Sequence, residues 1–320
     1  MSARGNLWVI VLAGGDGARL LGMTICGQRL NRPKQFCRMG EEKSLLRAAL
    51  DRGGWLTEPA RIVPVVCDPH RQWWEAETAH LPADNVLAQP SNKGNALAIL
   101  HALIHVLQRD ADPLVAVLPS DHAVEEEEPL IAALRSAIRT VSERREQVVL
   151  LGVPPDQADA EYGWILPARG EPGDALPVSA FVEKPPIEKA AELMRQGAVW
   201  NSFIFAGTGL GLIQLYGQTR PDLLQSYLEN MIKHGWRAQA LGPLYQAVEA
   251  ADFSREVLER ATDRLRVLTV KSCGWTDLGT PTRVRAWLEH RASRRPAGGR
   301  GLDGLGSRSR QASLPLQHAV

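Results

Sequence analysis

Residues 7–36 decide the fold of this chain and contain the segments LWVIVLAGGDGARL, LGMTICGQRLN and RPKQF in that order. Residues 7–12 are all apolar without alternation, which is typical of a central parallel strand covered on both faces. The glycine-rich turn at residues 14–17 follows directly, so it lies at the carboxyl end of this strand. Glycines in such a turn allow backbone N–H groups to approach an anion that any Cβ would hold off.

Two cations follow these glycines, Arg19 within the turn and Lys34 within RPKQF. Positive charge close to a glycine-rich turn predicts a cradle for a triphosphate. A dinucleotide fingerprint is excluded because the third glycine of GxGxxG is missing, and a P-loop is excluded because no GxxxxGK[ST] occurs. A tight turn that binds no ligand remains the simpler alternative.

Composition indicates a globular chain that can bury a full core, since 44% of its 320 residues are hydrophobic and 23% are charged. The net charge of +1 leaves no basic surplus for nucleic acid, so we expect none as a partner. Apolar runs stay below the roughly 18 residues of a membrane span. The four cysteines form no CxxC pair, which is typical of reduced thiols, and we expect a cytoplasmic protein.

Apolar strand patterns alternate with helical patterns along the chain, which predicts βαβ units and an α/β fold with a mostly parallel sheet. We expect strands at residues 7–12, 62–67, 86–89, 114–118, 148–153 and 265–271, and helices at residues 44–52, 70–80, 95–108 and 281–291. His101 and His105 lie four apart on one of these helices. We expect no zinc there, because no Glu lies between them and no third ligand is evident.

Asp121 follows the apolar strand at residues 114–118, in the segment LPSDH. Open α/β sheets bind their ligands at the carboxyl ends of such strands, so this carboxylate is a candidate site residue. A turn residue or a helix cap is the alternative for Asp121, because Asp is common in both.

GGDGARL with a downstream RPKQF resembles the sugar-1-phosphate nucleotidyltransferases, and most of all their mannose-1-phosphate guanylyltransferase branch. The similarity spans about residues 7–285 and continues through LPSDH, EYGWI, FVEKP, WNSFIFAG and GWTDLGT. The chain departs from the family pattern at three points: the usual Trp-Pro after Leu20 is absent, Trp164 replaces a Tyr, and Phe203 replaces a Gly. The resemblance implies a Rossmann-like mixed sheet with helices on both faces, as in nucleotide-diphospho-sugar transferases.

The resemblance also implies roles for individual residues. Four residues would be catalytic: Arg19, Lys34, Asp121 and Asp277. Two of them, Asp121 and Asp277, would bind Mg²⁺. The nucleotide would contact Leu12, Ala13, Gly14, Gly15, Gly17, Gln89, Gly94 and Ser120. The sugar phosphate would contact Gly163, Glu183, Lys184 and Asn201. Without the resemblance, Glu183 and Lys184 would be an ordinary exposed pair and Asn201 a turn residue.

The implied reaction is Mg²⁺-dependent transfer of a nucleotidyl group to a sugar 1-phosphate, with GTP and mannose 1-phosphate giving GDP-mannose and pyrophosphate. Residues 89–96, QPSNKGNA, also resemble thymidylyl- and uridylyltransferases, so transfer to glucose 1-phosphate is the alternative. An alternative of another class is a non-catalytic relative that binds nucleotide sugars and regulates a partner.

We expect one nucleotidyltransferase domain at residues 1–292, with a nucleotide-binding half at 1–155 and a sugar-phosphate-binding half at 156–292. Residues 293–320 are rich in Gly, Arg and Ser, which predicts a disordered tail. No hexapeptide repeat occurs, so we expect neither the β-helix nor the cupin isomerase domain of some relatives, and a monomer or weak homodimer.

Overall fold

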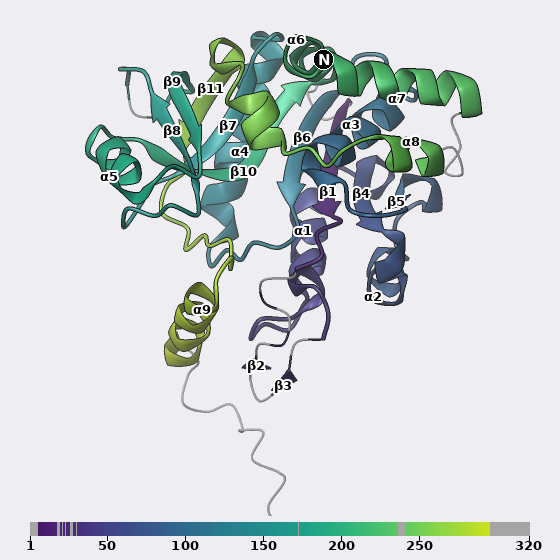
Figure 1. Cartoon of the computed structure of the whole chain (residues 1–320). Coiled ribbons are helices and arrows are strands. Elements are labelled where there is room, and N and C mark those ends of the chain that lie inside the picture. Colours follow the sequence, from purple (N-terminus) through teal and green to yellow (C-terminus); the bar gives the residue numbers. More distant parts are fainter. Residues whose placement is uncertain are drawn as a thin grey trace, which may run out of the picture.

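The computed structural model describes residues 6–17, 20, 22, 24–25, 28–29, 31–171, 173–235 and 241–294. Within them, one nine-stranded sheet has the order β5-β4-β1-β6-β10-β7-β11-β9-β8 and runs across the molecule (Figure 1). Its strands are β1 (Leu7–Ala13), β4 (Ile62–Cys67), β5 (Leu87–Gln89), β6 (Leu114–Pro119), β7 (Val148–Val153), β8 (Gly163–Pro167), β9 (Leu176–Glu183), β10 (Val199–Thr208) and β11 (Leu265–Thr269).

The first half of the sheet is parallel: β4 and β6 flank β1, and β5 extends the edge beyond β4. Strands β4 and β6 are buried at every position, as the unbroken apolar runs of the sequence predict. The carboxyl ends of all four strands therefore lie at one edge, and the glycine-rich turn follows β1 at that edge.

Helices cover both faces of the sheet, because alternate residues of a strand point to opposite sides. On β1, Trp8 and Ile10 belong to one apolar core, whereas Val9 and Val11 belong to the other. The first core is completed by α3 (Gly94–Leu107), α6 (Gly209–Thr219), α7 (Pro221–His234) and α8 (Leu241–Ala247). The second is completed by α1 (Leu45–Gly54), α2 (Arg71–Thr78), α4 (Glu127–Glu143) and α5 (Ile187–Arg195).

The second half of the sheet is mixed. Strand β10 lies between β6 and β7 and runs antiparallel to both, while β11 pairs parallel with β7 and antiparallel with β9. Strands β8 and β9 form an antiparallel pair. The predicted α/β class, with a mixed sheet and helices on both faces, is confirmed.

An irregularity in β10 shapes the edge where the glycine-rich turn lies. The pairing of β10 with β7 shifts register between Asn201 and Phe205, and Phe203 has a φ of +58° within this bulge. The Asn201 side chain accepts a hydrogen bond from the Phe203 backbone N–H at 3.0 Å. Phe203 stands where the family pattern has Gly, and the positive φ explains why glycine suits this position.

The helix α9 (Pro281–Arg294) ends the described part of the chain and packs against residues 37–39. Val284 and Trp287 join an apolar cluster with Cys37 and Met39, and the Trp287 indole N–H donates to the Met39 carbonyl at 3.0 Å. Both α9 and the small hairpin of β2 (Thr24–Ile25) and β3 (Gln28–Arg29) lie below the sheet in Figure 1.

Short helical turns complete the described elements. They are Lys34–Phe36, Pro59–Arg61, Asp68–His70, Ala83–Asn85 and Thr262–Arg264, which are 3₁₀, and Ser254–Leu258, which is π-helical. Among the helices of the described residues, none is both long enough and apolar enough to cross a membrane. The tail predicted at residues 293–320 lies outside the described residues from residue 295 onward.

Candidate active site

A pocket of about 330 Å³ opens where β1, β5 and β6 end. Its described lining combines residues from the parallel half of the sheet with residues of β8–β10 and of the loop after β11. Twelve predicted site residues belong to the lining: Leu12, Gly14, Gly15, Gln89, Gly94, Ser120, Asp121, Gly163, Glu183, Lys184, Asn201 and Asp277. The structure thus brings together residues as far apart in the chain as Leu12 and Asp277.

At two positions of the glycine-rich turn, an added Cβ would lie very close to neighbouring atoms. A Cβ on Gly14 would lie 2.7 Å from Gln89 Nε2, and a Cβ on Gly17 would lie 2.9 Å from the Pro33 Cα. Gly17 also has a φ of +63°, which side chains rarely adopt. Gly17 therefore serves the packing of the turn on RPKQF, and it is not among the described residues lining the pocket.

Gln35 is a site residue that the sequence analysis missed. Its amide donates to the Ala13 carbonyl at 3.2 Å and to the Gly15 carbonyl at 2.6 Å, and the side chain is only 2% exposed. Gln35 thus ties RPKQF to the glycine-rich turn, while the predicted residue Ala13 is buried beneath it. Its place next to Lys34 in the motif was the only available signal.

Lys34 connects two distant carboxylate-bearing loops. Its Nζ donates to the backbone carbonyl of Asp277 at 2.5 Å and lies 3.2 Å from Asp121 Oδ2. The other predicted cation, Arg19, lies outside the described residues. Lys34 therefore holds the end of β6 against the loop that follows β11.

Asp121 lies two residues beyond the end of β6, and its side chain is 36% exposed. Desolvation acts to raise its pKa, but the charges of Lys34 and His122 outweigh this and hold the pKa below its usual range. The imidazole of His122 lies 3.5 Å from Asp121 Oδ1. Asp121 is therefore ionised at neutral pH and available to a cation.

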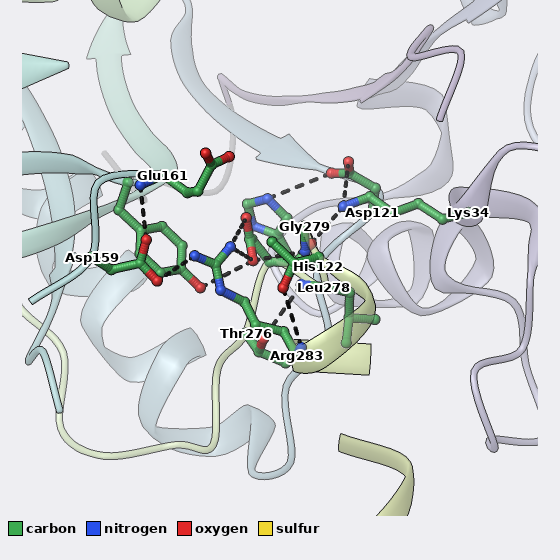
Figure 2. A network of polar contacts seen from close by, with 12 residues as sticks. Lys34, Asp121, His122, Asp159, Glu161, Thr276, Leu278, Gly279 and Arg283 are labelled. Atoms are coloured by element: carbon green, nitrogen blue, oxygen red, sulfur yellow. Dashed lines mark hydrogen bonds and ion pairs between the residues drawn. The ribbon is translucent and has the colours of Figure 1, made fainter. Parts of the chain in front are cut away.

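Asp277 is held by several donors, of which Figure 2 labels Gly279 and Arg283. Its Oδ1 accepts hydrogen bonds from the Tyr162 hydroxyl at 3.0 Å, the Gly279 N–H at 2.9 Å and Arg283 at 2.9 Å. Burial acts to raise the pKa of Asp277, but His122, Arg283 and Lys34 together hold it below its usual range. No pattern in the sequence linked Tyr162 or Arg283 to Asp277, because these contacts arise only in the folded chain.

The four residues predicted for the sugar phosphate lie together. A Cβ on Gly163 would collide with the Glu183 carboxylate and would lie 3.3 Å from the Asn201 Cβ. Glu183 is 9% exposed and lies 3.9 Å from the Lys184 ammonium. Burial and the nearby Asp252 raise the pKa of Glu183 to about 7. Glu183 is therefore a buried acid inside the pocket rather than half of an exposed pair.

Gln89 and Gly94 also line the pocket. Gln89 is 2% exposed, and its Oε1 accepts a hydrogen bond from the Tyr245 hydroxyl at 2.6 Å. Gly94 has a φ of +83°, and a Cβ there would collide with the Ala251 carbonyl. Ser120 is also buried, and its hydroxyl donates to the Leu12 carbonyl at 2.7 Å.

The two aspartates fit a magnesium ion. Mg²⁺ prefers hard oxygen ligands and typically uses one or two carboxylates, together with waters and substrate phosphates. Asp121 and Asp277 line the same pocket, and Gly279 leaves open the space beside Asp277 Oδ2 that a Cβ would fill. Among the described residues no group of three or more His, Cys, Asp and Glu side chains could hold a metal. A cation here would thus rely on substrate oxygens and water.

Known proteins resemble this chain over most of its length. A family profile described as nucleotidyl transferase matches residues 8–290. The chain belongs to the nucleotidyl transferase family.

Members similar to it include the mannose-1-phosphate guanylyltransferase of Escherichia coli K12, which is 28% identical over 87% of this chain and 59% of its own length. The alginate biosynthesis protein AlgA of Pseudomonas syringae pv. tomato is 28% identical over 84% of this chain and 56% of its own. This nucleotidyl transferase chain therefore spans little more than half the length of these relatives.

Among solved structures, the mannose-1-phosphate geranyltransferase of Thermus thermophilus superposes with a TM-score of 0.76. It is 29% identical, and the match covers 91% of this chain and 80% of that one. The family predicted from the motifs, and the similarity to its mannose-1-phosphate guanylyltransferases, are both confirmed.

Proposed function

We propose that this chain transfers a nucleotidyl group from a nucleoside triphosphate to a sugar 1-phosphate, with GTP and mannose 1-phosphate as the pair. The observation that carries the proposal is the contact of Lys34 with both Asp121 and Asp277, which line one pocket with the glycine-rich turn, Glu183 and Lys184. Relatives named mannose-1-phosphate guanylyltransferase match more than four fifths of this chain. They support this choice of substrates.

The proposed chemistry needs positioning and charge compensation more than proton transfer. A phosphate oxygen of the sugar 1-phosphate attacks the α-phosphorus of the triphosphate in line, and the bond to the departing pyrophosphate breaks. The nucleophile is already an anion, so no general base is required. A magnesium ion bound by Asp121 and Asp277 would supply charge neutralisation. Lys184 is proposed to hold the phosphate of the sugar, and Glu183 and Asn201 its hydroxyls.

The base is proposed to lie against Gln89 and Gly94. The Tyr245 hydroxyl donates a hydrogen bond to Gln89 Oε1. Among the described residues Gln89 Nε2 donates no hydrogen bond, so one of its N–H groups is left for a base carbonyl. Guanine has such a carbonyl, and so do uracil and thymine. Gln89 therefore also supports the second candidate, uridylyl or thymidylyl transfer to glucose 1-phosphate, and the relatives favour guanosine.

A matrix of reactions tests the proposal. ATP, GTP, CTP, UTP and dTTP are each combined with mannose 1-phosphate and glucose 1-phosphate in the presence of Mg²⁺, and pyrophosphate release is measured. We expect the highest rate with GTP and mannose 1-phosphate, and a loss of this rate in Lys34→Met.

Two other outcomes would replace the proposal. The highest rate with UTP or dTTP and glucose 1-phosphate would establish the second candidate. Binding of GDP-mannose without pyrophosphate release from any pair would indicate the regulatory, non-catalytic relative.

A further inference from the structure

Arg283 lies next to the pocket without being among the described residues that line it. It belongs to the first turn of α9, where its backbone N–H donates to the Thr280 side chain at 3.3 Å. One guanidinium nitrogen contacts both oxygens of Asp277, at 2.9 and 3.1 Å, and the other contacts Asp159 Oδ2 at 2.5 Å (Figure 2). The guanidinium also lies over the Tyr162 ring, 4.0 Å from its centroid.

These contacts make the two oxygens of Asp277 unequal. Oδ1 accepts from the Tyr162 hydroxyl, the Gly279 N–H and Arg283, whereas Oδ2 has only the 3.1 Å contact with Arg283 among the described residues. A carboxylate oxygen offers about two lone-pair sites. Oδ1 is therefore saturated, and Oδ2 is the oxygen that remains available to a cation.

The surroundings of Arg283 explain why an arginine suits this position. Arg283, Asp159 and Asp277 are only 13, 15 and 17% exposed, so their charges must compensate one another. The planar fork of a guanidinium can bridge two carboxylates and stack on a ring at the same time, which an ammonium cannot do. The same group thus sets the orientation of Asp277 and contacts the ring of Tyr162, which lines the sugar side of the pocket.

We propose that Arg283 is a positioning residue that, together with Tyr162 and Gly279, fixes the orientation of the Asp277 carboxylate and so presents Oδ2 to a divalent cation before substrate arrives. The inference rests on the proposed function, because it takes Asp277 as a metal ligand. Residues that hydrogen-bond to a metal ligand and fix its orientation typically contribute about 10–100-fold to metal affinity. Arg283 therefore acts through Asp277 and does not touch substrate.

Binding of Mn²⁺, a spectroscopic substitute for Mg²⁺, tests the inference directly. The free-ion electron paramagnetic resonance signal is titrated with the full chain, without nucleotide or sugar. We expect Arg283→Met to weaken Mn²⁺ binding about 10–100-fold. Arg285→Met is the matched control, because Arg285 is exposed on the same helix and the substitution removes the same charge. We expect it to leave the affinity unchanged.

Unchanged or tighter Mn²⁺ binding in folded Arg283→Met would overturn the inference, and tighter binding would mean that Arg283 competes with the cation. Absence of Mn²⁺ binding to the unmutated chain would also overturn it, since no site would then be prepared ahead of substrate.

A second variant serves if Arg283→Met does not fold, because that substitution leaves Asp159 and Asp277 as two uncompensated buried carboxylates. Tyr162→Phe keeps the ring and removes one donor to Oδ1. We expect it to weaken Mn²⁺ binding severalfold, and unchanged binding would count against the inference.

The reaction matrix separates the two proposals. Weaker Mn²⁺ binding in Arg283→Met, with no pyrophosphate from any pair of substrates, would refute the function and leave the role of Arg283 intact. Pyrophosphate release with unchanged Mn²⁺ binding in Arg283→Met would support the proposed function and refute the role of Arg283.

Discussion

Glu183 shows how burial changes the chemistry of a single residue. Its pKa is raised from 4.5 to about 7, first by burial and then by Asp252. Because the folded-state pKa lies above the unfolded one, the protonated carboxyl contributes full stability below about pH 4.5, and this contribution is lost as the pH rises through about 7.

We expect Glu183→Gln to remove this pH dependence. At pH 8 the free energy of unfolding should exceed that of the unmutated protein by up to roughly 3 kcal/mol, and the difference should shrink towards pH 4.5. Urea denaturation at several pH values measures it. Glu188→Gln, at an exposed position of α5, is the control and should change little. A difference independent of pH would contradict the raised pKa.

Asp121 and Asp277 are predicted to act as one unit in binding a cation. Each Asn variant should lose roughly 10²-fold or more in kcat, and the double variant should lose much less than the product of the two. Non-additivity follows because the same ion is lost either way. The measurement is kcat for each variant, with circular dichroism to confirm the fold. If Asp277→Asn kept nearly full activity while Asp121→Asn had none, Asp277 would be a structural partner of Arg283 only.

At the scale of elements, α8 controls a side chain at the end of β5. Tyr245 on α8 is 3% exposed, and its hydroxyl holds Gln89 Oε1. Among the described residues no other hydrogen bond to the Gln89 side chain fixes which end of the amide faces the pocket. Under the proposed function, the contact between α8 and β5 would therefore affect which base the pocket accepts.

We expect Tyr245→Phe to weaken base discrimination, because the Gln89 amide can then turn its oxygen to the pocket. One hydrogen bond contributes about 0.5–1.5 kcal/mol, so the ratio of kcat/KM for GTP over ATP should fall roughly 2- to 10-fold. Tyr227→Phe is the matched control: this buried tyrosine on α7 contacts His101 at 2.7 Å and should leave the ratio unchanged. An unchanged ratio in Tyr245→Phe would show that Gln89 does not depend on α8.

For the whole molecule, the two candidate metal ligands are charge-compensated by protein cations. Lys34 pairs with Asp121, and Arg283 pairs with Asp277. Both carboxylates therefore have a protein cation beside them without a bound metal, unlike the ligands of a structural zinc site, whose binding energy is folding energy.

Chelation should separate activity from stability. We expect EDTA to abolish turnover, added Mg²⁺ to restore it, and the melting temperature of the ligand-free protein to remain unchanged. Scanning calorimetry with and without EDTA measures this melting temperature. A marked fall in the melting temperature would mean that a metal stabilises the fold in a way the charge pairs do not explain.

Patterns of consecutive residues were enough to predict the class of fold and the edge of the sheet at which the pocket lies. Unbroken apolar runs predicted the strands β1, β4 and β6, and the positions of the glycine-rich turn and of Asp121 followed from where those strands end. These features are local, because strand periodicity and turn chemistry are written in consecutive residues. The motifs also sufficed for the family.

Which polar groups meet depends on how the whole chain folds. The insertion of β10 between β6 and β7, the contact of Lys34 with a carbonyl 243 residues away, and the hold of Arg283 on Asp277 depend on partners that no local pattern specifies. The contacts of Gln35 and Tyr245 could not be predicted from the sequence for the same reason. The physical cause is that buried polar groups must find partners wherever packing places them, and packing is a property of the whole chain.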